Sequence, residues 1–426
     1  MTEKKATEYW YVHGDAYDLS SYAKVHPGGE YQLNVLRGRD CTEMVYSMHA
    51  MASLDKVKKI LAKYKVENVK QKEEVAPFIW GDEGLYSVLK TRVNEMFNGK
   101  NHKSDFFFWF VSALEFLAQI ALFYFWISGR SYLSPFITGL LTTSLGFMIF
   151  HTAGHNGISK NPKVNNFWYK LFADYILGFI SDLWNIHHNY AHHCYTNIHR
   201  KDPDVSNALA VIRKNPYQTP KPIHKQQWYV AYILLVFMPN QWFGQVLQYL
   251  MSTMRGKIFG VPLIQKNERK LSPFVIFGAI GLALFALVAF KQGLGFAMIS
   301  IYLYSCGVGF AYWACVFPNH DTDLSEQSNV DDVVKNGADW GEHQVRHSSN
   351  FWLPDIFSLM VGGMNYQIEH HLFPTINPRF YPKISKIVRE ECAKRKIPYH
   401  LHSSWFHALK GNFNHLWTMS KLKKKE

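Results

Sequence analysis

Four long apolar segments most constrain what this chain of 426 residues can fold into. As helices, they are candidates to cross a hydrocarbon core of about 30 Å. They cover residues 105–128, 134–150, 273–290 and 296–316. The short connections 129–133 and 291–295 predict two helical hairpins. Glu115 interrupts the first segment and is expected to face protein rather than lipid. A shorter apolar stretch begins at Trp228 and stops before Pro239, so 228–250 is interpreted as re-entrant or interfacial.

Clusters of histidine lie beside these apolar segments. They comprise His151 and His155; His187, His188, His192 and His193, followed by His199; and His370 and His371, with Gln367 before them and His320 upstream. Ionisable groups at the edge of a bilayer need partners or a function. No cysteine shares their spacing, so imidazole is the expected ligand, and it suits iron, copper, zinc and nickel. A spacing of four places His151 with His155, and His188 with His192, on shared helix faces.

The number of histidines indicates two metal ions rather than one. A zinc ion normally takes four ligands, and this chain offers more imidazoles than that. With a cytosolic N-terminus and four spans, residues 151–271 and 317–426 return to one side of the membrane. If 228–250 also crossed, the third cluster would lie opposite the first two. Polar helix ends at the membrane interface remain an alternative.

Charge and cysteine content limit the partner classes. The formal net charge is +13, but Lys and Arg flank the apolar segments, at 255–257, 266–270 and 421–425. This pattern is typical of the cytosolic side of a membrane protein, and nucleic acid is not an expected partner. The five scattered cysteines fit a reducing compartment, and the polar start, 1–9, predicts a cytosolic front end.

The first part of the chain has a different character. Residues 1–70 have the short alternating and helical patterns of a small soluble unit, with a His-Pro-Gly-Gly turn at His26 and a second histidine at His49. Residues 66–83 are charged and contain Pro77, which predicts a linker. Residues 84–98 show helical spacing of apolar side chains. This predicts an amphipathic helix that lies on the membrane surface or on the next domain.

The motifs His-x-x-x-His, His-x-x-x-His-His and Gln-x-x-His-His, in this order between two apolar hairpins, resemble those of the membrane fatty acyl desaturases. Gln367 in the third motif resembles the front-end desaturases, which carry an N-terminal cytochrome b5 domain. The resemblance implies a small α+β cytochrome b5-like haem domain at 1–70. A linker and amphipathic helix at 71–104 would follow. Residues 105–426 would form an all-α membrane desaturase domain with four transmembrane helices and a cytosolic histidine-rich cap.

The resemblance also implies a di-iron centre of two Fe ions. Its ligands would be His151, His155, His188, His192, His193, His320, Gln367, His370 and His371. Spacing leaves His187 open as a substitute for His188. Gln367 stands where other desaturases carry histidine, so contact through water is one role for it. His343 and His347 are expected beside the ligands or at the surface. Candidates to orient the rings, or simply to cap helices and solvate loops, are Asp182, Asp202, Asp204 and Glu369.

His26 and His49, with Tyr17-Asp18-Leu19 before the first loop, resemble the two haem-ligand loops of cytochrome b5. Haem b is therefore implied. Two axial imidazoles leave the iron no open position, so this haem is expected to transfer electrons. Fusion holds the electron donor at high effective concentration. The resemblance implies electrons from NADH through a separate cytochrome b5 reductase, then the haem, then the di-iron site, where O2 is used.

The implied reaction places a cis double bond in a long-chain polyunsaturated fatty acyl chain. This chain would be linked to CoA or to a phospholipid, and membrane lipid would surround the enzyme. The second motif, with 195–197 and 202–204, resembles Δ5 or Δ4 enzymes more than Δ6 enzymes. Open alternatives are a sphingoid long-chain-base desaturase, an acyl hydroxylase and a haem electron carrier with an inactive membrane domain. Both termini are expected in the cytosol. Lysines 423–425 resemble a retrieval signal of the endoplasmic reticulum.

Overall fold

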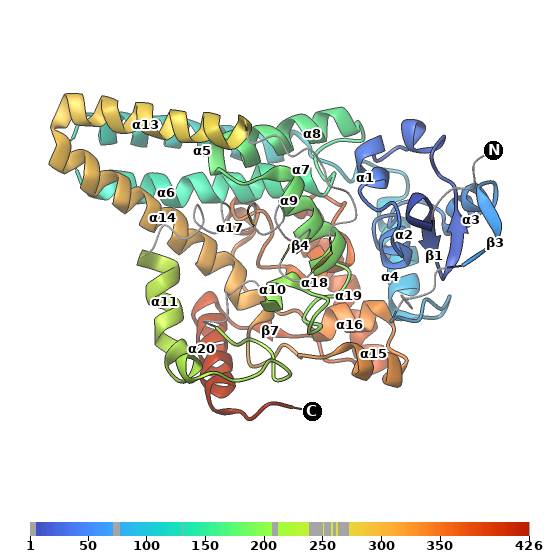
Figure 1. Ribbon diagram of the computed structural model, residues 1–426. Coiled ribbons are helices and arrows are strands. Elements are labelled where there is room, and N and C mark those ends of the chain that lie inside the picture. Colours follow the sequence, from blue (N-terminus) through green and yellow to red (C-terminus); the bar gives the residue numbers. More distant parts are fainter. Residues whose placement is uncertain are drawn as a thin grey trace.

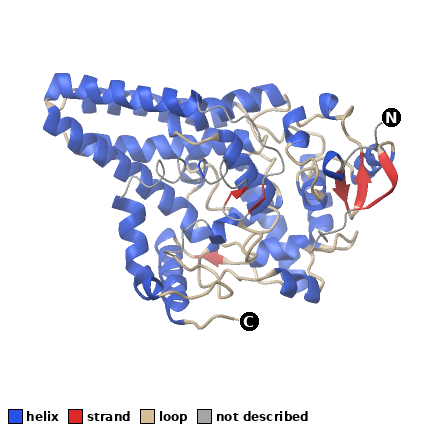
Figure 2. Cartoon of the chain, viewed as in Figure 1, coloured by secondary structure: helices blue, strands red, loops and turns tan. Residues whose placement is uncertain are grey.

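The computed structural model describes residues 6–70, 77–129, 131–206, 212–237, 250, 257–258, 261–262 and 272–425. A small mixed unit at the N-terminus adjoins a larger helical domain, and the four longest helices run side by side away from it (Figure 1). The three longest strands belong to the N-terminal unit, whereas the rest is almost entirely helical (Figure 2). The expected fold, a small α+β domain followed by an all-α domain, is confirmed.

The N-terminal unit is built on an antiparallel sheet of order β1-β2-β3. Its elements are β1 (Trp10–Val12), β2 (Asp15–Tyr17), α1 (Glu30–Asn34), α2 (Thr42–Ser47), α3 (Leu54–Ala62) and β3 (Lys65–Lys70). The predicted linker at 66–83 is wrong at both ends. β3 pairs with β2, so 66–70 belongs to the sheet. Phe78 is buried in the helical domain, where the Ile79 amide donates to the Ala338 carbonyl. Residues 71–76 lie outside the described residues.

Four helices of the described residues are long and apolar enough to cross a membrane, which confirms the four predicted spans. They are α5 (Phe106–Ile127); α6 (Leu133–Gly146) continuing through the π-helix η3 (Phe147–His151) and α7 (Thr152–Gly154); α13 (Ser272–Gln292); and α14 (Leu294–His320). Large side chains such as Phe290, 86 % exposed, point outward where lipid would cover them. The sequence places His320 just past the fourth span, but in the structure it is the last residue of α14.

Close contact between α6 and α14 aligns their histidine-bearing ends. A side chain at Gly139 would collide with the Tyr304 carbonyl, and one at Gly307 with the Phe136 carbonyl. Small residues allow membrane helices to approach in this way. Glu115 of α5 is buried and accepts a hydrogen bond from Ser144 Oγ at 3.0 Å, so it faces protein as expected.

The remaining elements form the cap around the ends of these helices. They are α4 (Leu85–Phe97), α8 (Pro162–Lys170), η4 (Leu171–Leu177), α9 (Ser181–Asn185), η5 (Ile186–His192), α10 (Pro203–Ser206), η6 (Pro222–Gln226), α11 (Gln227–Phe237), α15 (Val330–Asn336), α16 (Trp340–Arg346), α17 (Asp355–Met360), α18 (Gln367–Leu372), η7 (Pro378–Phe380), α19 (Tyr381–Arg395) and α20 (Trp405–Lys421). The two-residue strands are β4 (Lys257–Ile258), β5 (Val261–Pro262), β6 (Asn350–Phe351) and β7 (Leu401–His402).

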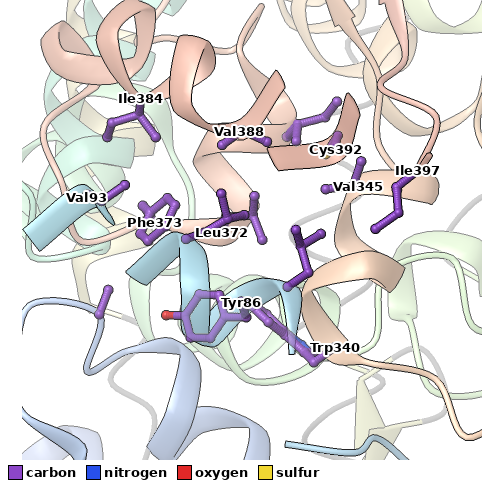
Figure 3. Packing of buried hydrophobic residues seen from close by; sticks show 14 of the residues in the cluster. Tyr86, Val93, Trp340, Val345, Leu372, Phe373, Ile384, Val388, Cys392 and Ile397 are labelled. Carbon is purple, nitrogen blue, oxygen red and sulfur yellow. The ribbon is translucent and has the colours of Figure 1, made fainter. Parts of the chain in front are cut away.

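Helix α4 lies on the helical domain, which decides between the two positions predicted for 84–98. Its buried Tyr86 and Val93 pack among side chains of α16, α18 and α19, including Trp340 and Val388 (Figure 3).

Of the segment 228–250, α11 is described up to Phe237 and contacts α14 and α20. Residues 238–249 lie outside the described residues, so the re-entrant or interfacial character of this segment stays a prediction.

Candidate metal and haem centres

The first two histidine motifs lie on helices that include π-helical turns. η3 ends at His151, and the α-helical bond from the His155 amide to the His151 carbonyl places both rings together, as predicted. η5 contains His188 and His192, but there the His193 amide donates to the His188 carbonyl, five residues back. The His188 ring centroid lies 4.6 Å from that of His193 and 5.4 Å from that of His192. The predicted shared face of His188 and His192 is confirmed, since their rings stack, and the π-helical turn brings His193 to the same side.

The histidines converge into two adjoining groups. The first histidine set consists of His151, His155, His188 and His370, whose ligand nitrogens all lie within 4.8 Å of one another. The second histidine set consists of His192, His320 and His371, within the same limit. His193 lies between them: its ring centroid is 4.6 Å from that of His370 and 4.2 Å from that of His371. Residues more than 200 positions apart in sequence thus share one interior site.

The donor chemistry of these rings fits metal ions. Both ring nitrogens of His155, and the Nε2 atoms of His370 and His371, are buried without a hydrogen-bond partner among the described residues. Such unpaired buried groups are costly. The Nε2 atoms of His151 and His188 are 3.1 Å apart. Two nitrogens bound at right angles to one ion, each about 2.1 Å from it, would have a similar separation of about 3 Å.

Burial keeps most of these imidazoles neutral. It lowers the pKa of His155, His188, His193, His370 and His371 well below the ordinary value. A neutral imidazole has the free lone pair that a metal ion requires. His192 differs. Although burial opposes its charged form, Asp202 and Asp204 raise the pKa of His192 to about 9.

Carboxylates orient the second motif. His192 Nδ1 donates to both carboxylate oxygens of Asp202 at 3.1 Å, and Nε2 is then directed to the second histidine set. His187 Nε2 pairs with Asp204 at 2.5 Å. The structure therefore brings His188, and not His187, into the first histidine set. Of the other candidates to orient rings, Glu369 instead contacts Asn350 and Tyr399, and Asp182 faces Tyr31 of the N-terminal unit.

Neutral groups orient the third motif and His320. His371 Nδ1 donates to Gln344 Oε1 at 2.9 Å, and His370 Nδ1 is 3.2 Å from the Tyr381 hydroxyl. His320 Nδ1 donates to the carbonyl of His347 at 3.1 Å. His343 is also buried and donates to the Thr196 carbonyl. His343 and His347 therefore support the cluster from inside the protein, which excludes the surface alternative.

Gln367 belongs to the same interior. It begins α18, and its Nε2 donates to His320 Nε2 at 2.9 Å, whereas its Oε1 accepts from Asn319 Nδ2 at 3.2 Å. Gln367 is thus in direct contact with a ring of the second histidine set.

The N-terminal unit brings the rings of its two histidines close together. The ring centroids of His26 and His49 are 6.1 Å apart. One iron bound by both rings through nitrogens at about 2 Å would produce a spacing close to this. His26 Nδ1 donates to the Gly29 carbonyl and His49 Nδ1 to the Val45 carbonyl, which leaves both Nε2 atoms for iron. Burial lowers the pKa of His49 to about 4, so its ring is neutral.

A small apolar cavity adjoins the first histidine set. It is lined by Thr143, Phe147, Phe150, Leu177, Phe179, Val308 and Tyr312. The Phe147 ring centroid is 6.3 Å from that of His151, so an apolar chain in this cavity would lie beside the histidines.

Two features of the site were missed by sequence reasoning. The Trp184 ring stacks on His188 with centroids 4.3 Å apart. Lys90 of α4 donates to the carbonyl of His49 at 2.8 Å, so the helical domain holds a haem-site loop. Aromatic residues such as Trp184 near a histidine motif and lysines such as Lys90 on an amphipathic helix are both common. The sequence alone therefore did not indicate a role at the site for either residue.

Comparisons with known proteins agree with the two-part organisation. Residues 129–403 match the family model described as fatty acid desaturase, and residues 2–70 match that of the cytochrome b5-like haem/steroid binding domain. The chain is 27 % identical over 425 residues to a probable Delta(5) fatty acid desaturase C of Dictyostelium discoideum, covering 96 % of this chain and 91 % of that protein. It is 31 % identical over 417 residues to a chloroplastic acyl-lipid (7-3)-desaturase of Chlamydomonas reinhardtii, covering 91 % and 75 %. It is 26 % identical over 446 residues to an acyl-lipid (8-3)-desaturase of Mortierella alpina, covering 97 % and 94 %.

Proposed function

The chain belongs to the fatty acid desaturase family and carries a cytochrome b5-like domain, and we propose that it is a front-end desaturase of long-chain polyunsaturated acyl chains. The observation that carries this proposal is the pair of histidine sets joined by His193 at the ends of four apolar helices. In this proposal the haem domain comprises 1–70, the connection 71–104 and the membrane desaturase domain 105–426.

The two histidine sets are proposed to hold two Fe ions. One would be bound by the first histidine set, the other by His192, His320 and His371, with His193 between them. An ion bound at His320 Nε2 would replace the hydrogen bond from Gln367, which would then act on that ion through a water molecule. When bound, this pair of ions supplies, with O2, the oxidising power that removes hydrogen from an unactivated methylene. The net reaction is R-CH2-CH2-R + O2 + 2 e⁻ + 2 H⁺ → R-CH=CH-R + 2 H2O.

The protein's own task is to place one methylene pair beside this site and to exclude water. The apolar cavity supports binding of the acyl chain, since Phe147 and Phe150 line it and Phe147 contacts the His151 ring. Asp202 and Gln344 hold the rings of His192 and His371 in one orientation, so that Nε2 faces the ions.

Haem b is proposed to be bound by His26 and His49 and to be the electron donor. An NADH-dependent cytochrome b5 reductase would supply the electrons, as the resemblance implies. The endoplasmic reticulum is the proposed location, with both termini in the cytosol. The N-terminal unit and α18, which carries His370 and His371, lie at the same end of the helix bundle, and this supports a shared side of the membrane (Figure 1).

A Δ5 double bond in a lipid-linked acyl chain is the proposed specificity. Relatives named Delta(5) fatty acid desaturase and acyl-lipid desaturase support it, and Δ4 is the second candidate from the second motif. Yeast that expresses the chain should be fed a panel of polyunsaturated acids, and the products analysed by gas chromatography. A new cis double bond at the Δ5 position confirms the proposal, and one at Δ4 favours the second candidate. An alcohol would instead indicate a hydroxylase, and a modified sphingoid base would indicate a long-chain-base desaturase.

A further inference from the structure

A buried hydrogen-bond network connects the haem-site loop to the first histidine set. It begins at Gln32 on α1, the helix that follows the His26 turn. Gln32 Oε1 accepts from the Tyr190 hydroxyl and, at 3.3 Å, from Asn185 Nδ2. Asn185 Nδ2 also donates to the Tyr190 hydroxyl at 3.2 Å. The N-terminal unit and the helical domain thus share one polar junction.

The network continues to the metal site. Asn189 Nδ2 donates to Asn185 Oδ1 at 2.5 Å and to the Gly154 carbonyl at 3.0 Å. Gly154 directly precedes His155, and Asn189 directly follows His188, so both ends of this bond belong to segments of the first histidine set. Asn185 and Asn189 are buried, which makes their hydrogen bonds costly to lose.

Apolar packing surrounds the junction. Tyr190 and the adjoining Leu183 and Ile186 form one buried cluster with Leu36 and the partly buried Leu33 of the N-terminal unit. Lys90 and Tyr86 of α4 meanwhile hold the second haem-site loop, through the carbonyls of His49 and Ser47. The first haem-site loop is therefore held by the helical domain, and the second is held by α4, which packs on that domain. A domain attached only through its linker would have no such contacts.

We propose that Gln32, Tyr190, Asn185 and Asn189 are positioning residues that dock the haem unit on the first histidine set for direct electron transfer. This inference rests on the proposed function. Each desaturation consumes two electrons, and haem b carries one at a time. Two successive one-electron transfers across this junction are therefore needed, each oxidising Fe(II) haem to Fe(III), with NADH as the ultimate reductant. Docking at a fixed distance makes both transfers intramolecular.

The test uses the full-length protein with its haem reduced anaerobically and then mixed with O2 and an accepted acyl substrate. Stopped-flow absorption follows the loss of reduced haem. Gln32→Leu removes the acceptor, Tyr190→Phe removes one donor, and Gln32→Glu keeps the acceptor oxygen. We expect Gln32→Leu to slow haem oxidation by about tenfold or more, equal to about 1.4 kcal/mol of docking. Tyr190→Phe should also slow it, and Gln32→Glu should restore a rate near that of the wild type.

The matched control is Tyr217→Phe, which removes a buried phenol contact with Asp332 in the cap. Its rate should equal that of the wild type. In all variants the haem spectrum, haem midpoint potential, iron content and product formed per two electrons should stay unchanged, because the network affects docking only. If Gln32→Leu loses haem or iron, Tyr190→Phe decides the question. Wild-type rates in both Gln32→Leu and Tyr190→Phe would overturn the inference. Absence of product in the wild type would instead refute the proposed function.

Discussion

Replacing Glu43 by Gln provides a quantitative test of the contact between the haem unit and the helical domain. Glu43 of α2 is buried, and its Oε2 accepts from the Tyr195 hydroxyl at 3.2 Å, two residues past the second histidine motif. Its Oε1 has no hydrogen-bond partner among the described residues. Burial, together with the charge of Asp40, raises the pKa of Glu43 from 4.5 to about 8.

The sign of the pH dependence follows from this raised pKa. Between pH 4.5 and about 8 the folded protein keeps the proton on Glu43, whereas the unfolded chain has lost it. The free energy of unfolding therefore falls as pH rises through this window and levels off above it. Each tenfold difference in proton affinity between the folded and unfolded chain corresponds to about 1.36 kcal/mol. Because the pKa of Glu43 rises from 4.5 to about 8, the free energy of unfolding falls by about 3–5 kcal/mol across the whole window. The Gln side chain of the Glu43→Gln variant is neutral at every pH, so this variant does not lose that stability as pH rises.

The assay is the midpoint of unfolding of the haem unit, followed by haem absorption in the detergent-solubilised protein between pH 5 and pH 9. We expect Glu43→Gln and the wild type to be similar near pH 5. The variant should become the more stable one by a few kcal/mol at pH 8. A difference that does not change with pH would refute the buried, protonated state of Glu43.

Other substitutions test the metal site and the cavity. His188→Ala should abolish desaturation and metal binding, whereas His187→Ala should retain bound iron, because only His188 reaches the first histidine set; iron analysis of both proteins checks this. Asp202→Asn removes the carboxylate charge beside His192 Nδ1 and should lower metal affinity by about 10–100-fold, measured by competition with a chelator. His192→Ala should end double-bond formation with the haem spectrum intact, and His26→Ala should remove the haem; normal desaturation by the first variant would contradict the ligand assignment. Thr143→Phe fills the cavity and should lower kcat/KM by about tenfold or more for long acyl chains, a loss of about 1–3 kcal/mol, measured by product analysis.

Much of the architecture could be predicted because it depends on local chemistry. Apolar length alone predicts the four spans, and spacing alone predicts that His151 and His155 share a helix face. Two short motifs predict His26 and His49 as haem ligands, and the two rings do lie close together. Each of these signals lies within one segment of sequence, where helix geometry and hydropathy act directly.

The rest depends on contacts that sequence spacing does not contain. The π-helical turn of η5 brings His193 as well as His192 beside His188, which α-helical spacing does not predict. The charged composition of 66–83 indicated a linker, yet tertiary pairing makes a strand of its first part and buries Phe78 in its last. Lys90 and Gln32 reach across the two domains, and neither position shows this in isolation.

The most direct measurement is the ratio of non-haem iron to haem in the purified full-length protein. Total iron is determined by mass spectrometry and haem by its absorption, with iron-edge anomalous diffraction to locate the ions. The account predicts two non-haem irons for each haem, one at each histidine set and adjoining His193. A single ion, none, or ions located away from these rings would contradict it.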